Sequence, residues 1–385
     1  MDSHIVEPID LFEGDYMDAA YRGAAPFKII DRTDAAGRRI SVLYEGSTLM
    51  LEDAALSAAA GVPMEKLIQG ITYVEANAGG WDSSKRLADM DLADLDHSVL
   101  NPSTPGLRVG FVEDPSLAAA MCRAWNDFTA DHCEAGKGRL SANMILPWQD
   151  VDLALAELDR VSQRSCFRGV IMRPAPEYPN GFLGDPVFDR IYSAIEERGL
   201  CLILHSCAPR EGIGGSIVSH YRNAGRPYWH ATLYGIMLNF PFEAWAAWAQ
   251  LVFEGVLDRH PALKVMLTES HGGWIVTALE RMDEYAKGGE ALRVAYQMRL
   301  DLLPSEYFAR QGFIIFEGDE ETMTYSAEHI GGSMLWALDY PHADCSFPDG
   351  PQNFRDNLKK LPTSVQRAIA WDNGARAYGL NGSAP

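Results

Sequence analysis

The feature that most constrains the fold is an alternation of short apolar runs with amphipathic helical runs, which extends from about residue 95 to residue 339. This pattern is typical of βα units that close on a parallel sheet. The clearest run covers residues 200–205, where five apolar residues precede His205. A continuous apolar strand indicates a sheet that is covered on both faces, as parallel sheets are.

The series contains eight expected strands, a number that favours a closed barrel over an open doubly wound sheet. We therefore predict an α/β fold, a (β/α)8 TIM barrel, with residues 1–385 forming a single domain. Helices are expected over residues 115–135, from residue 150 onward, and over residues 186–198. The expected strands cover residues 2–6, 95–100, 141–146, 167–172, 200–205, 263–268, 312–316 and 334–339.

Two segments interrupt the alternation, near residues 14–50 and 206–240. The first contains two apolar runs, residues 27–30 and 39–43, on either side of a polar turn at residues 34–37, which predicts a β-hairpin. The active face of a barrel is built from the loops that follow its strands. We expect both insertions to cover that face, with inert decoration as the alternative.

Composition excludes several classes of function. The net charge of −20 disfavours binding to nucleic acid or to an anionic membrane surface, and no Lys/Arg-rich run makes an exception. The apolar stretches are short or interrupted by charge, so we expect a soluble cytoplasmic protein. The six cysteines are scattered without a CxxC pair, and we interpret them as buried thiols in a reducing compartment.

Polar side chains end several of the expected strands. His4, His205 and Asp339 lie at the ends of the first, fifth and eighth strands, and Asp2 shares the strand face of His4. The carboxyl ends of barrel strands meet at one mouth. Two imidazoles and a carboxylate with an open coordination position form a catalytic site for Zn²⁺ and related cations. We predict one divalent ion, zinc first and manganese as the alternative.

Three further residues are candidates for contact with substrate. His271 follows the sixth strand and is either an acid/base or oxyanion-stabilising group, or a histidine bonded to solvent at a helix start. Arg173 ends the fourth strand and binds either a substrate carboxylate or a neighbouring acid. Trp274 is expected to line the pocket, with a place in the barrel core as the alternative.

The motifs resemble those of a known family. The opening Asp2-Ser3-His4-Ile5-Val6-Glu7-Pro8 resembles the D-x-H-x-x-E-P start of the amidohydrolase-2 family, in the branch of aminocarboxymuconate-semialdehyde decarboxylase. Later blocks resemble those of the family in the same order, so the likeness spans essentially the whole chain. These blocks are residues 167–170, Arg173-Pro174, residues 260–264, residues 269–273 and residues 339–342.

The resemblance implies a barrel with one catalytic metal, bound by His4, His205 and Asp339 with Asp2 as a possible fourth ligand. It also implies that His271 is the acid/base or substrate-polarising residue. Dinuclear relatives carry a carboxylated lysine near the position of Arg173, so a single metal is favoured. One departure is Asp2, whose side chain is shorter than the His or Glu of many members. Another is a first strand that is short compared with the family.

Two reactions use the same residues. The favoured one is nonoxidative decarboxylation of a small aromatic or unsaturated carboxylic acid, with Asp339 or His271 protonating the carbon that loses CO₂. The alternative is hydrolysis of a C–C, ester, lactone or amide bond, with Asp339 taking a proton from the attacking water. A third hypothesis is a binding protein that kept the barrel without catalysis. The expected partners are a small-molecule substrate and a second copy of the chain in a homodimer.

Overall fold

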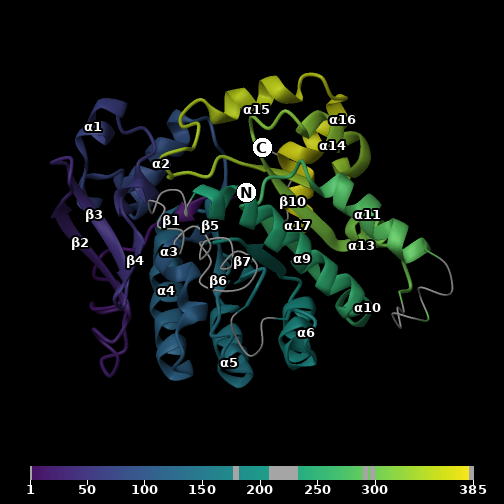
Figure 1. Ribbon diagram of the computed structural model, residues 1–385, viewed down its shortest axis with the longest axis horizontal. Coiled ribbons are helices and arrows are strands. Elements are labelled where there is room, and N and C mark those ends of the chain that lie inside the picture. Colours follow the sequence, from purple (N-terminus) through teal and green to yellow (C-terminus); the bar gives the residue numbers. More distant parts are fainter. Residues whose placement is uncertain (1, 177–181, 208–232, 289–293, 295–299, 381–385) are drawn as a thin grey trace.

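A curved sheet of eight parallel strands lies at the centre of the computed structural model, which describes residues 2–176, 182–207, 233–288, 294 and 300–380. Helices surround this sheet (Figure 1). All recorded pairings between neighbouring strands of the sheet are parallel. In spatial order the strands are β1 His4–Ile5, β5 Ser98–Pro102, β6 Leu140–Ile145, β7 Phe167–Met172, β8 Cys201–His205, β9 Lys264–Thr268, β10 Gly312–Glu317 and β11 Met334–Ala337.

The helices begin at recognisable capping residues. Asp114 precedes α4 and accepts a hydrogen bond from the Ser116 amide, while Asp150 caps α5 in the same way. The α-helices are α1 Met64–Gln69, α2 Ser83–Leu92, α3 Thr104–Leu107, α4 Pro115–Ala135, α5 Val151–Val161, α6 Asp189–Glu197, α9 Phe240–Phe253, α10 Val256–Arg259, α11 Ile275–Lys287, α13 Pro304–Gln311, α14 Met323–Ile330, α15 Gly350–Leu358, α16 Thr363–Arg367 and α17 Asn373–Tyr378.

The barrel architecture predicted from the sequence is confirmed. The expected bounds of β7 and α4 agree with the structure, and most other strands differ by one to three residues at their ends. The first strand is shorter than predicted, because only His4 and Ile5 pair with β5. The eighth strand ends at Ala337, so Asp339 lies two residues beyond it.

Three hydrogen bonds join the first strand to the segment that follows the last one. The His4 amide donates to the Tyr340 carbonyl over 2.7 Å, and the Asp339 amide donates to the Asp2 carbonyl over 3.3 Å. The Ser3 hydroxyl donates to the same Tyr340 carbonyl. These contacts complete the ring at its carboxyl end. Farther along the seam, β1 and β11 separate around a cavity of about 230 Å³ whose lining includes Ser3.

Arg86 of α2 holds this seam from outside. Its side chain is 1% exposed, and its Nη1 donates to Ser3 Oγ over 2.7 Å while its Nη2 donates to the His4 carbonyl. The Nε atom donates to the Gly79 carbonyl over 2.8 Å, and the guanidinium lies 4.5 Å from the centre of the Tyr340 ring. Burial lowers the pKa of Arg86 to about 10, so the side chain stays charged at neutral pH. Both sides of the seam therefore contact one cation.

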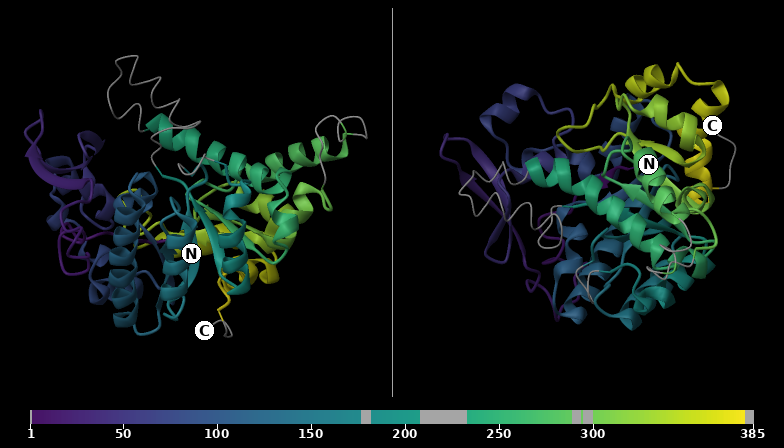
Figure 2. Two further views of the ribbon diagram at one scale, coloured as in Figure 1. Left: turned by 90° about the horizontal axis from the view of Figure 1, so that it is seen from below. Right: turned by 45° about the vertical axis from the view of Figure 1, so that its right-hand side comes forward.

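The predicted hairpin is also confirmed and extends to a three-stranded antiparallel sheet of β2 Phe27–Thr33, β3 Arg39–Glu45 and β4 Thr48–Leu51. Both views of Figure 2 place this sheet at one flank of the barrel. Its Glu45 carboxylate forms an ion pair with Arg108, which follows α3. Most of the second insertion, residues 208–232, lies outside the described residues, so its expected place over the mouth stays a prediction.

Among the described residues, no helix combines the length and the apolar character needed to span a membrane. Location in the cytoplasm and the single-domain organisation of residues 1–385 stay predictions.

Replacing Arg86 with methionine tests whether the seam depends on this cation. The change leaves the Ser3 hydroxyl and two backbone carbonyls without their buried donor, so the apparent free energy of unfolding in urea should fall by about 2–4 kcal/mol. Arg281→Met is the matched control, because Arg281 is 53% exposed and pairs only locally with Glu284 and Tyr285. Its effect should stay within about 0.5 kcal/mol. Equal stability of the two variants would contradict the role given to Arg86.

Candidate metal centre

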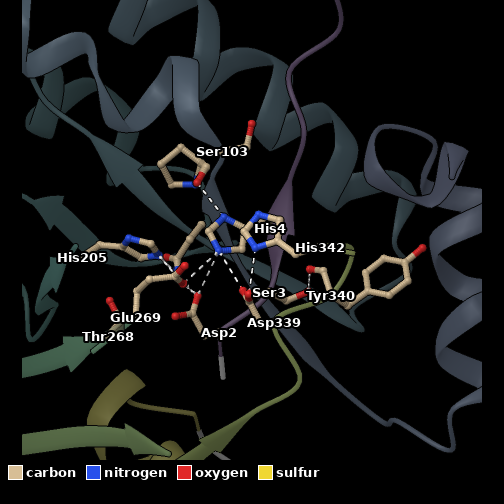
Figure 3. Close-up of polar contacts among 12 residues, drawn as sticks. Asp2, Ser3, His4, Ser103, His205, Thr268, Glu269, Asp339, Tyr340 and His342 are labelled. Carbon is tan, nitrogen blue, oxygen red and sulfur yellow. Dashed lines mark hydrogen bonds and ion pairs between the residues drawn. The ribbon is translucent and has the colours of Figure 1, made fainter. Parts of the chain in front are cut away.

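Four side chains from three places in the sheet converge at the carboxyl end of the barrel. Asp2 precedes β1, His4 lies on β1, His205 ends β8, and Glu269 follows β9. Each offers one ligand atom, and these atoms lie within 4.8 Å of one another. Figure 3 shows the four side chains directed toward a common centre, with Asp339 beside them.

The distances between these atoms suit a shared cation. His4 Nε2 lies 3.7 Å from Asp2 Oδ1 and 3.7 Å from Glu269 Oε2. His205 Nε2 lies 3.7 Å and 3.8 Å from the same two oxygens. Two ligands that are each about 2.1 Å from one ion are separated by roughly 3–4 Å. The four atoms therefore have the spacing of a coordination shell.

Both histidines present the nitrogen that a metal would need. His4 Nδ1 lies 2.8 Å from the Pro102 carbonyl, and His205 Nδ1 lies 2.7 Å from the Ser206 carbonyl. A carbonyl can only accept, so Nδ1 carries the proton in each neutral ring and Nε2 has a free lone pair. Within the described part of the chain, neither buried Nε2 atom has a hydrogen-bond partner. This arrangement fits a bound cation.

Asp2 is held in place by neighbouring strands. Its side chain is 3% exposed, and Oδ1 accepts a hydrogen bond of 2.5 Å from Asn101 Nδ2 on β5. Asn101 in turn accepts from Asn143 Nδ2 on β6 over 2.7 Å. Burial alone would raise the pKa of Asp2, but His205 and His4 lower it below its ordinary value. Asp2 is thus an oriented carboxylate, despite its short side chain.

Asp339 joins the group through His4 and His342. Its Oδ1 lies 3.1 Å from His4 Nε2, and its Oδ2 accepts from His342 Nδ1 over 2.7 Å. The His342 ring stacks on the His4 ring with 4.3 Å between the ring centres, and His4, Asp339 and His342 form a second group whose ligand atoms lie within 4.8 Å of one another. Burial raises the pKa of Asp339, but His342 and His4 lower it below its ordinary range. The backbone φ of Asp339 is +59°, an uncommon value for a residue other than glycine.

Glu269 is the site residue that the sequence reasoning missed. It lies directly after β9, whose last residue, Thr268, pairs in register with His205. Its position next to the strand partner of His205 is a signal for a site residue, whereas the sequence prediction names His271, two residues later. A φ of +55° turns the chain at Glu269, and the side chain is 23% exposed in the mouth. Such strain in a non-glycine residue is common at functional sites.

His271 lies outside this cluster. Its side chain is 59% exposed, with Nδ1 3.5 Å from Glu320 Oε1 and Nε2 3.8 Å from Glu317 Oε1. The Glu320 carboxylate raises the pKa of His271 to about 9. His271 is therefore a cationic group on the same loop as Glu269, paired with Glu317 at the end of β10 and with Glu320 shortly after it.

The two expected substrate contacts have structural partners. Arg173 is 5% exposed, and its Nη2 lies 3.6 Å from Glu243 Oε1 of α9. Of the two partners expected for Arg173, a substrate carboxylate or a neighbouring acid, this contact is of the second kind. Trp274 donates from Nε1 to the Ser270 and His271 carbonyls over 3.0 and 2.9 Å, so it holds the loop that carries Glu269. A role for either residue in substrate binding stays a prediction.

Residues 73–380 match the family model described as amidohydrolase. The chain belongs to the amidohydrolase family. The resemblance inferred from the motifs, and with it the expectation of an enzyme of the amidohydrolase superfamily, is confirmed. His4 and Asp2 precede the matched region, so their assignment depends on the geometry described above.

Two curated relatives of this amidohydrolase are decarboxylases. The 2-amino-3-carboxymuconate-6-semialdehyde decarboxylase of Dictyostelium discoideum is 24% identical over 319 residues, which cover 82% of this chain and 81% of that protein. The gamma-resorcylate decarboxylase of a Polaromonas species is 22% identical and the match covers 77% of this chain and 87% of that protein.

Solved structures share the fold. An amidohydrolase from Mycobacterium avium subsp. paratuberculosis has a TM-score of 0.73 at 19% identity, over 98% of this chain and 97% of its own. The 5-carboxyvanillate decarboxylase of Sphingomonas paucimobilis has a TM-score of 0.61 at 26% identity, with coverages of 77% and 83%. A dihydroxybenzoic acid decarboxylase from a Polaromonas species, solved with manganese and 2-nitroresorcinol, has a TM-score of 0.61 at 18% identity, with coverages of 78% and 86%.

The cluster makes a direct prediction about metal content. His205→Ala should reduce the bound divalent ion from about one per chain to a small fraction, because it removes a buried ligand. Glu269→Gln should weaken metal binding by ~10-fold or more. His329→Ala, a change at an exposed residue of α14, is the control and should keep the ion. The measurement is elemental analysis after dialysis against graded chelator concentrations. Unchanged binding by Glu269→Gln would remove Glu269 from the ligand set.

Proposed function

We propose that this amidohydrolase is a metal-dependent decarboxylase of a small aromatic or unsaturated carboxylic acid. The observation that carries the proposal is the pair of buried Nε2 atoms of His4 and His205, which have no hydrogen-bond partner among the described residues and are surrounded by carboxylates at the mouth of the barrel. The relatives support the choice of reaction, because the curated proteins described above are decarboxylases of unsaturated or aromatic acids.

The proposed cofactor is one divalent ion, held by His4 and His205 together with Asp2, Glu269 and Asp339. Imidazole nitrogens suit Zn²⁺, whereas carboxylate oxygens suit Mn²⁺, so a set with both fits either ion. The manganese in the dihydroxybenzoic acid decarboxylase supports Mn²⁺ as an equal candidate. A divalent ion at this place would act as a Lewis acid toward an oxygen of the substrate.

Decarboxylation also needs a proton at the carbon that loses CO₂, and two groups of this chain are candidates to supply it. The first is Asp339, whose Oδ2 accepts a hydrogen bond of 2.7 Å from His342 Nδ1 inside the site. The second is His271, which is half exposed at the rim and can exchange protons with solvent. We propose that His271 is the acid/base group and that Asp339 receives or returns the proton next to the reacting carbon.

Hydrolysis is the second candidate, and one observation favours it. His342 and His4 keep the pKa of Asp339 below its ordinary range, so this carboxylate is in the form that can take a proton from an attacking water. The same ligands would serve both reactions. The two hypotheses therefore differ in the fate of the substrate and not in the residues that they require.

Isotopes from the solvent distinguish the two reactions. The purified enzyme is supplied with Mn²⁺ or Zn²⁺ and screened on gamma-resorcylate, 5-carboxyvanillate and related acids, esters and lactones. A decarboxylase should release CO₂, and in D₂O it should place deuterium on the carbon that carried the carboxylate. Solvent ¹⁸O in a product acid, without CO₂ release, would instead establish hydrolysis and overturn the decarboxylase proposal.

His271→Asn tests the acid/base role separately from metal binding. The variant should retain its ion, because His271 lies outside the ligand cluster, while turnover should fall by ~10²-fold or more. His329→Asn is the matched control and should change neither quantity. The experiment measures metal content and single-turnover rates on the same preparation. Loss of the ion together with preserved residual activity would reverse the assignment of His271.

A further inference from the structure

A second chemically distinctive site lies at the opposite end of the barrel, where the strands begin. A cavity of about 620 Å³ is lined by the start of β6 and by the residues that precede β5 and β7. Two thiols, Cys133 and Cys166, lie in its wall together with Arg164 and Arg168. The metal centre is at the carboxyl ends of the strands, so this cavity is separate from it and independent of the proposed function.

The fold brings the two cysteines together from distant positions in the chain. Cys133 is in the last turn of α4, is 3% exposed, and faces the barrel core. Cys166 directly precedes β7, and its carbonyl accepts a hydrogen bond of 3.0 Å from the Ala142 amide of β6. Both cysteines therefore flank the start of β6. The Cys166 side chain is partly exposed, whereas Cys133 lies behind it.

The two thiols shift each other's pKa in opposite directions. A hydrogen bond from Cys133 to the Cys166 sulfur raises the pKa of Cys133 and lowers that of Cys166, and the nearby Arg164 and Arg168 lower the pKa of Cys166 further. A thiolate is the nucleophilic form of cysteine, and positive neighbours favour it. Cys166 thus combines partial exposure, a cationic environment and an adjacent second thiol.

Other cysteines of the chain have a different environment. Burial raises the pKa of Cys122 well above its ordinary value, and it raises the pKa of Cys201 to about 12. Both side chains are fully buried in the core. These two residues fit the interpretation as inert buried thiols, and they provide matched controls for the reactive pair.

We propose that Cys133 and Cys166 are a redox-active dithiol that a peroxide converts to an intramolecular disulfide. The Cys166 thiolate attacks one oxygen of hydrogen peroxide, the O–O bond breaks, and a sulfenic acid and hydroxide form. The Cys133 thiol then attacks the sulfenic sulfur, an S–S bond forms, and the sulfenic oxygen leaves as water. The two thiols lose two electrons, and the peroxide is reduced to two molecules of water once hydroxide takes up the proton that Cys166 released on forming its thiolate.

The structure supports each step of this chemistry. The partly exposed Cys166 is the sulfur that a small oxidant in the cavity reaches first. The buried Cys133 lies in the wall of the same cavity, so closure of the disulfide is intramolecular. The sulfurs of a disulfide lie about 2 Å apart, and side-chain rotation would bring them together. The product would tie the end of α4 to the start of β7.

The test treats the full-length, metal-loaded protein with a small excess of hydrogen peroxide and then blocks free thiols. Proteolysis without reduction should yield a cross-linked peptide pair containing Cys133 and Cys166, and the intact mass measured before the blocking step should fall by about 2 Da. Cys201→Ser should still form the bond, whereas Cys166→Ser should not. Dithiothreitol should reverse the change, and metal content should stay constant throughout.

Three results would overturn the proposal. One is sulfinic acid on Cys166 with Cys133 still free, which would show that the second thiol does not react. Another is a disulfide between two chains in place of the intramolecular bond. The third is full recovery of both free thiols at a peroxide dose that oxidises an unstructured cysteine peptide in the same tube. Because the cross-link is mapped in the unmodified chain, the result does not depend on the folding of a variant.

Discussion

The interaction on which the rest of the structure depends is the contact of the Arg86 guanidinium with both sides of the barrel seam. One buried guanidinium reaches Ser3, the His4 carbonyl and the face of Tyr340, so it contacts the first strand and the segment after the last one. A two-residue first strand offers few ladder hydrogen bonds of its own. Arg86 donates hydrogen bonds at the seam, where the short β1 forms few ladder hydrogen bonds. A buried charge of this kind is tolerated only because its own hydrogen bonds are satisfied.

The candidate metal centre is built on this same seam. Asp2 and His4 come from one side of it, and Asp339 with His342 comes from the other. Three carboxylates, those of Asp2, Glu269 and Asp339, then meet two buried imidazoles in a small volume. Burial of so much negative charge is costly unless a cation is present. Burial lowers the pKa of His4, but the Asp339 and Glu269 carboxylates raise it well above its ordinary value, so the surroundings of His4 favour positive charge.

How much of this site the sequence could predict follows from how each residue is placed. His4 and His205 lie on regular strands, where the alternation of side chains and the convergence of strand ends indicate their position. Glu269 lies one residue past its strand, in a turn with positive φ that no periodicity signals. Arg86 lies on α2, and sequence patterns identify such a helix only as amphipathic, without showing that Arg86 reaches the seam. Arg173 directly follows β7, close to its predicted place, but its contact with Glu243 depends on the packing of α9.

Both ends of the barrel bring together residues that are distant in the sequence, but the segments that carry these residues differ. Residues after the strands lie in loops, where strained backbone at Glu269 and Asp339 directs carboxylates into the mouth. Residues before the strands lie in the short turns that return from each helix, where packing usually dominates. Cys133 and Cys166 meet there because α4 and β7 both adjoin β6, not because a loop carries them. A reactive pair at this end is therefore coupled to the rigid framework of the barrel, and its chemistry can change without displacing a metal ligand at the other end.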